Sequence, residues 1–137
     1  MTVTTDRAAS PLTRITPGIK IAAQISPEAP AEDLQWIRQM GVEHVVLWTD
    51  GEHAGPAYYR DRSNYFEDHG LHVYGFGNAD VHNQPSIVLA DENRNRKIEE
   101  YLNHLRALGA AGIPYTTYAH MPNGIWSTER EATRGGA

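Results

Sequence analysis

Hydrophobic residues follow two alternating patterns along this chain: short runs rich in β-branched and aromatic residues, and longer stretches with apolar residues three or four positions apart. The first pattern is typical of buried strands and the second of amphipathic helices. The predicted strands are residues 19–25, 42–49, 71–76 and 113–118. The predicted helices are residues 30–40, 57–69 and 91–108, and a glycine, the residue that most often closes a helix, follows each of them. Strict alternation of strands and helices predicts an α/β fold with parallel strands.

Two of these segments also predict which side chains are buried. Residues 45–48 are apolar without interruption, which is typical of a strand buried on both faces, as in parallel sheets. The helix 91–108 has one apolar stripe that we expect to face the core. This stripe consists of Ile98, Leu102, Leu105 and Leu108.

The carboxyl ends of the predicted strands are expected to lie at one rim, because crossovers between parallel strands are right-handed. Ligands bind at this rim in α/β folds. The polar residues expected to gather there are Ser26, Asp50, Asn78, His82 and His120. In the alternative, the chain forms a small open sheet on which these residues are ordinary solvated loop side chains.

The length of the chain bears on the architecture. A closed eight-stranded α/β barrel takes about 250 residues, whereas this chain has 137 and no predicted helix after the last strand. We therefore expect either the first half of a longer barrel or two copies that complete one another as a homo-oligomer. Residues 1–18, rich in Thr, Ala, Ser and Pro, are predicted to be a flexible tail, and residues 19–137 a partial barrel domain.

Composition excludes several classes of function. The chain has 12 Lys and Arg against 17 Asp and Glu, a net charge of −5, which disfavours a nucleic-acid partner. No apolar run approaches the roughly 18 residues of a membrane helix, and the N-terminus lacks the apolar core of a signal peptide, so we expect a cytoplasmic protein. The absence of cysteine excludes disulfides and thiolate metal ligands on this chain. No phosphate-binding loop, dinucleotide-binding glycine motif or serine-hydrolase motif is present.

One stretch of the chain resembles a known family. The helix sequence IEEYLNHLRALGAAGI is followed by a predicted strand that ends in Tyr118, then by Met121-Pro122 and by Trp126. A weaker match is Val81-His82, after the third predicted strand. In these features the chain resembles the mannonate dehydratases, which are metal-dependent sugar-acid lyases on a xylose-isomerase-like TIM barrel. The resemblance covers roughly residues 19 to 130.

The resemblance implies a fold, a reaction and a cofactor. The fold would be the first half of a TIM (β/α)8 barrel, with about four β/α units. The reaction would remove water from D-mannonate, a small sugar acid, to give 2-dehydro-3-deoxy-D-gluconate, with Mn²⁺ or Fe²⁺ as the cofactor. The family's metal ligands, a set of the His, Cys, His, Asp type, lie on later strands, so the resemblance implies no metal ligand on this chain.

The chain also departs from the family pattern, and alternatives stay open. Ala22-Ala23 replace bulky aromatic residues, Asn83 and Gln84 replace acidic ones, and Ser127 follows the tryptophan where a basic residue is expected nearby. These departures bear on the substrate. A sugar isomerase or epimerase of the same superfamily is the second hypothesis, because its ligands also lie on later strands. A non-catalytic half-barrel that dimerises is the third.

Five residues are candidates for the site. His120, just after a predicted strand, is the candidate for proton transfer, and His82, in the long loop 77–90, is a candidate for substrate contact. Trp126 offers a face for stacking on a sugar ring, Tyr118 a hydroxyl at the rim, and Asn78 a polar group there. The structural alternatives are ordinary loop histidines, a tryptophan that closes the core, and a tyrosine hydroxyl buried against a neighbour.

The remaining residues of interest have simpler interpretations. Trp48 is expected to pack in the core, and Asp50 with His53 would be a weak cation site. The other histidines lie inside predicted elements or at a helix end and are expected to be structural. These are His44, His69, His72 and His104.

Overall fold

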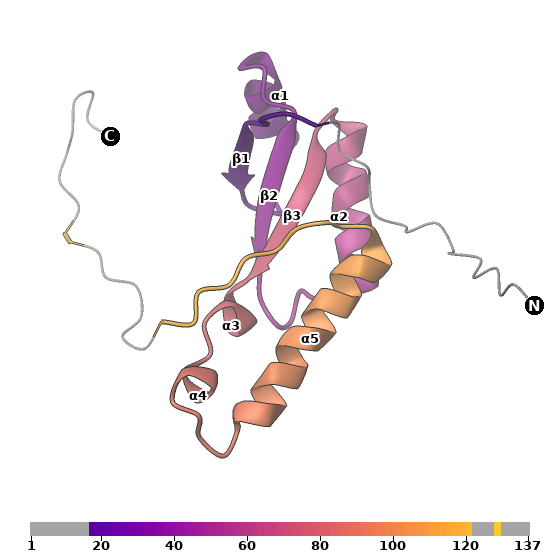
Figure 1. Cartoon of the computed structure of the whole chain (residues 1–137). Helices are drawn as coiled ribbons and strands as arrows, with labels where there is room; N and C mark the ends of the chain where they lie inside the picture. The colour runs from indigo at the N-terminus through magenta and orange to yellow at the C-terminus, as the bar shows by residue number, and fades with distance from the viewer. Residues whose placement is uncertain (1–16, 122–127, 130–137) are drawn as a thin grey trace, which may run out of the picture.

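A computed structural model of the chain describes residues 17–121 and 128–129, and Figure 1 shows the arrangement of its elements. The strands are β1 (Ala22–Ile25), β2 (His44–Thr49) and β3 (His72–Asn78). The helices are α1 (Ala31–Gln39), α2 (Pro56–Asp68), α3 (Ala79–His82), α4 (Pro85–Val88) and α5 (Arg94–Ala111). The predicted alternation of strands and helices is confirmed. None of the described helices is both long and apolar enough to cross a membrane.

The strands form a parallel sheet in the order β1-β2-β3. An irregularity between Val45 and Val46 shifts the register of β2 against β3, so that Val46 pairs with Gly75. Since all three strands run in the same direction, their carboxyl ends lie at one rim. The predicted α/β fold, with parallel strands and helices arranged as in half a barrel, is confirmed.

The core lies between one face of the sheet and the helices. Val45 and Leu47 of β2 are fully buried there, together with Tyr59 and Phe66 of α2. The residues of β2 that alternate with them are only half-buried. The prediction that this strand is buried on both faces is therefore wrong, because within the described residues the helices cover one face only.

The prediction of a fourth strand at residues 113–118 is also wrong. Residues 113–118 make a single parallel bridge, between Gly75 and Tyr115, where the Phe76 amide donates to the Tyr115 carbonyl at 3.2 Å. The next position does not continue the ladder, because the Thr116 hydroxyl donates to the Phe76 carbonyl at 2.6 Å in place of a backbone amide.

The segment 77–90, predicted to be a polar loop, contains the two short helices. Asn78 begins α3 by accepting a hydrogen bond from the Asp80 amide at 3.0 Å. Pro85 lies in the first turn of α4. The connection from β3 to α5 is therefore ordered into turns that hold the rim of the sheet.

Helix α5 buries only part of the predicted stripe, with Leu108 buried and Leu102 half-buried. Leu108 is buried, but Ile98 and Leu105 are each 38% exposed. The buried position of the stripe is taken by His104, which is 6% exposed and faces Tyr59 of α2. A buried polar contact between helices thus sets the rotation of α5, which hydrophobic spacing does not reveal.

Candidate functional site

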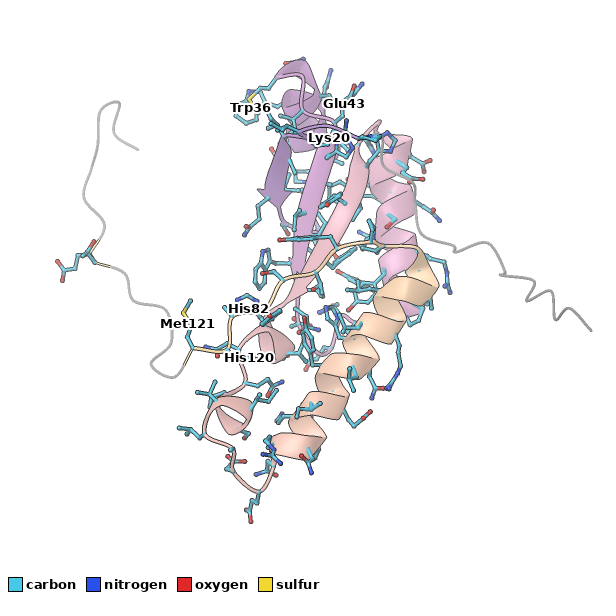
Figure 2. The ribbon with its side chains drawn as sticks, viewed as in Figure 1. Lys20, Trp36, Glu43, His82, His120 and Met121 are labelled. Carbon is cyan, nitrogen blue, oxygen red and sulfur yellow. The ribbon has the colours of Figure 1, made fainter. Side chains whose placement is uncertain are left out.

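His82 and His120 lie close to one another at the rim, as Figure 2 shows. His82 ends α3, and the amide of Ala119 donates to its carbonyl at 2.9 Å. The His82 ring meets the edge of Trp48, with ring centroids 4.9 Å apart. The expected meeting of these two histidines at the rim therefore occurs in the structure, although residues 117–121, which carry His120, form no strand.

The sequence predicted that Trp48 packs in the core. In the structure Trp48 is only half-buried, lies outside the core cluster and contacts the His82 ring instead. It lies over Gly77, where an added Cβ would come within 2.8 Å of the indole ring. Only glycine leaves room for the indole at this position. The position of the His82 ring thus depends on a residue without a side chain on the neighbouring strand.

The hydrogen bonds of His82 fix which nitrogen carries its proton. Nδ1 lies 3.3 Å from the Thr117 carbonyl, which can only accept, so Nδ1 donates. In the neutral ring, Nε2 is then an acceptor with a free lone pair, and among the described residues it has no hydrogen-bond partner. This arrangement also suits the imidazolium, since protonation of Nε2 leaves the Nδ1 hydrogen bond intact.

The hydrogen bonds of His120 have the opposite polarity. Its Nδ1 accepts from the Gln84 amide at 3.2 Å, so the neutral ring carries its proton on Nε2. Gln84 is itself fixed, because its side chain donates to the Asp80 carbonyl at 2.8 Å. Asn83 accepts from the Met121 amide at 3.1 Å and holds the same segment. The rim therefore offers one imidazole acceptor and one imidazole donor.

Tyr118 is 65% exposed, and its hydroxyl has no partner among the described residues. Its ring lies 5.5 Å from that of His120 and meets the ring of Tyr101 edge-on at 6.0 Å. The tyrosine thus presents its hydroxyl at the rim. Tyr101 of α5 also contacts the rings of Tyr118 and His120, although the sequence did not indicate that Tyr101 lies at the rim. Trp126 lies outside the described residues.

Asn78 lies apart from the two histidines. It is 2% exposed, and its side chain donates to the Asp50 carbonyl at 3.0 Å while accepting from Asp80. Both polar atoms thus have a structural partner. Asp50 binds the amides of its own loop, and the hydrogen bond from the His53 amide is the main cause of the lowered pKa of its carboxyl.

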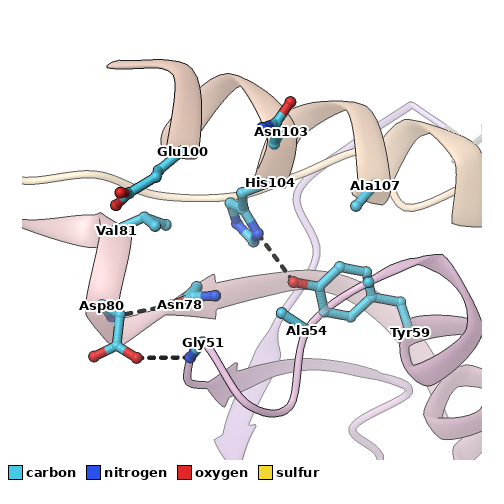
Figure 3. Close-up of a pocket in the computed structure, with 11 residues that line it drawn as sticks. Gly51, Ala54, Tyr59, Asn78, Asp80, Val81, Glu100, Asn103, His104 and Ala107 are labelled. Carbon is cyan, nitrogen blue, oxygen red and sulfur yellow. Dashed lines mark hydrogen bonds between the residues drawn. The ribbon is translucent and has the colours of Figure 1, made fainter. Parts of the chain in front are cut away.

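A cavity of about 420 Å³ opens on the helix-covered side of the rim (Figure 3). The loop after β2, the beginning of α3 and the side of α5 form its walls. Its lining includes Tyr59, Asn78, Asp80, Glu100, Asn103 and His104. Apart from Asn78, none of these was a candidate from the sequence.

His104 and Tyr59 form a buried relay beside this cavity. The Thr116 hydroxyl gives its hydrogen to Phe76, so it accepts from Nε2 of His104 at 3.0 Å. Nδ1 is therefore the acceptor and receives the Tyr59 hydroxyl hydrogen at 3.0 Å. Burial lowers the pKa of His104 and raises that of Tyr59, so both groups are neutral at neutral pH. His104 is structural, as expected, but it also links α2, α5 and the segment that carries His120.

No metal centre is apparent in the part of the chain that the structure describes. No group of three or more His, Asp or Glu side chains there could hold an ion. The Asp50–His53 pair, with Nδ1 and Oδ1 3.0 Å apart, has only two ligands. The metal that the family resemblance implies would therefore need ligands beyond these residues.

Comparison with known proteins bears on the family. The sequence profile of the D-mannonate dehydratase (UxuA) family matches residues 27–135, which include α1 to α5 and both rim histidines. No curated protein and no solved structure matches the chain. Because the profile spans well over half of the sequence and agrees with the order of strands and helices, the chain belongs to the D-mannonate dehydratase family.

Proposed function

We propose that the rim of this chain binds D-mannonate and takes part in its dehydration to 2-dehydro-3-deoxy-D-gluconate. The family match supports a hydro-lyase over the isomerase or epimerase alternative. The observation that carries the proposal is the pair of histidines with opposite hydrogen-bond polarity at the carboxyl ends of the strands. A polyhydroxy acid has both donors and acceptors that such a pair would recognise.

The reaction breaks the C–H bond next to the carboxylate and the C–O bond of the β-hydroxyl, and it releases water. His82 is the better proton acceptor in this proposal, because its Nε2 lone pair is free and the Thr117 carbonyl stabilises the resulting imidazolium. The proton it takes up can leave with the β-hydroxyl as water. His120 would donate from Nε2 to a substrate oxygen, since its Nδ1 accepts from the Gln84 amide. This assignment reverses the roles that the sequence suggested for the two residues.

Mn²⁺ or Fe²⁺ belongs to this proposal only through the family resemblance. The described residues do not fit a metal site. The proton steps above therefore use only side chains of this chain. A lyase assay of the chain with Mn²⁺ and D-mannonate tests whether these side chains are sufficient, and turnover would show that they are.

Binding can be tested on the chain as it is. Proton–carbon spectra of the imidazole groups, recorded during titration with D-mannonate, are expected to show saturable shifts of His82 and His120. His82→Gln and His120→Gln should each weaken binding about tenfold, since each removes one hydrogen bond to a charged or polyhydroxy ligand. His72→Gln is the matched control, because His72 lies at the opposite end of β3. Unchanged affinity in both rim variants would refute the site.

The dimerising half-barrel stays a prediction. Size-exclusion chromatography with light scattering tests it directly. A tight dimer with a cooperative melt supports it, and a monomer contradicts it.

A further inference from the structure

We propose that two copies of this chain associate by packing α1 of one copy against α5 of the other, so that Trp36 of α1 sits over Gly109 of α5. The inference does not depend on the proposed dehydration. It gives the dimerising half-barrel a defined surface, and the partner that this surface fits is a second copy of the chain.

The sheet is open on both sides. β1 lies at one edge, and no described residue pairs with its outer side. At the other edge Tyr115 adds one parallel bridge to Gly75, and the described residues form no further pairing beyond it. Unpaired strand edges readily pair with another chain. Three strands and the position of Tyr115 provide half of an eight-stranded parallel barrel, so two copies are enough to close one.

The outer side of α1 is apolar and exposed. Arg38 points toward the end of α2, because its guanidinium lies beside Gly70, where an added Cβ would come within 3.2 Å of Nε. Trp36 and Met40 each lie two positions from Arg38, so they project from the opposite side of the helix. Their exposed fractions are 62% and 52%. Figure 2 shows Trp36 on the side of α1 that faces away from α2.

The outer side of α5 has a notch. Ala107 faces α2, because it lines the cavity of Figure 3 together with Tyr59. Leu105 and Gly109 each lie two positions from Ala107 and are therefore on the side of α5 away from α2. Leu105 is exposed, and a Cβ added at Gly109 would meet no atom within 4 Å. An apolar side chain thus lies one helical turn from open space.

No contact within the single chain explains a glycine at position 109. Its φ is not in the left-handed region, and α5 continues to Ala111. Glycine inside a helix lowers stability relative to alanine, but it lets a neighbouring group approach closely. Trp36 is the largest exposed apolar side chain among the described residues, and the notch beside Leu105 can receive its indole. The contact joins two different surfaces, and such a contact forms a closed ring when the rotation closes, here at two copies.

Sedimentation velocity of the whole chain at a series of concentrations measures the dissociation constant of the dimer. Trp36→Ala and Gly109→Leu should each weaken the dimer at least about tenfold, the first by removing the indole and the second by filling the notch. Gly109→Leu should also raise the melting temperature of the dilute monomer, because leucine is the better helix former. Leu89→Ala is the matched control, since Leu89 is an exposed apolar side chain after α4, and it should dimerise like the parent.

An equal mixture of the two variants tests which surfaces meet. A mixed dimer has one contact in which Trp36 and Gly109 are both intact, so the mixture should dimerise more tightly than either variant alone. A parent chain that is monomeric at every concentration measured, or a mixture no tighter than the variants, would overturn the proposal. If Gly109→Leu does not fold, the comparison of Trp36→Ala with Leu89→Ala decides. The D-mannonate titration of the rim is a separate measurement, so the two proposals can fail independently.

Discussion

The buried His104 predicts a specific dependence of stability on pH. The side chain is 6% exposed, and burial lowers its pKa below the ordinary value of about 6.5. Above that ordinary value the histidine is neutral in both states and contributes no dependence. Below it the unfolded chain binds a proton that the folded chain does not, so stability falls as the pH falls, until the pKa of the folded state is reached.

The magnitude follows from one proton. The slope contributed by His104 is at most about 1.4 kcal/mol per pH unit, a large fraction of the roughly 5–15 kcal/mol that stabilises a small domain. Protonation would also place a hydrogen on Nδ1, where the Tyr59 hydroxyl now donates. Acid should therefore loosen the contact between α2 and α5 before other parts of the fold.

Urea unfolding at a series of pH values measures this slope. His104→Gln cannot titrate, so its free energy of unfolding should fall less steeply below pH ~6.5 than that of the parent, by up to about 1.4 kcal/mol per pH unit. Leu105→Gln is the control, because it changes an exposed position of the same helix without removing a titratable group, and its slope should stay like that of the parent. The reasoning is refuted if His104→Gln shows the same pH dependence as the parent.

Three further substitutions test packing and hydrogen bonding. Gly77→Ala places a methyl 2.8 Å from the indole of Trp48 and should cost about 1–3 kcal/mol by urea unfolding while shifting the His82 ring resonances; an unmoved His82 ring would contradict the support by Trp48. Thr116→Val loses the hydrogen bond to Phe76 and the acceptor for Nε2 of His104 and should cost about 1–3 kcal/mol, and an unchanged melting temperature would show that these two bonds add nothing. Phe66→Ala empties a fully buried position and should cost about 3–5 kcal/mol by urea unfolding, so a loss below about 1 kcal/mol would mean that the helices pack differently.

Local sequence determined the order and direction of the elements. Apolar runs, helical spacing and a glycine after each long helix suffice for this, because each depends on residues near one another in the chain. Parallel strands then follow from the alternation, and so does a shared rim for their carboxyl ends. His120 reaches this rim through hydrogen bonds between its own segment and the connection after β3. The family resemblance could also be recognised from the sequence alone, because the residues that carry it, such as Tyr118 and Met121, lie within one short stretch of the chain.

Tertiary contacts decided the rest. The fourth strand fails because a hydroxyl, that of Thr116, takes the carbonyl that a backbone amide would need. The face that α5 buries depends on a hydrogen bond between Tyr59 and His104, which are 45 residues apart. The proton positions on the rim histidines depend on partners 35 and 36 residues away. Hydrophobic spacing does not encode such pairings, because the energy of a polar group depends on which partner the folded chain brings to it.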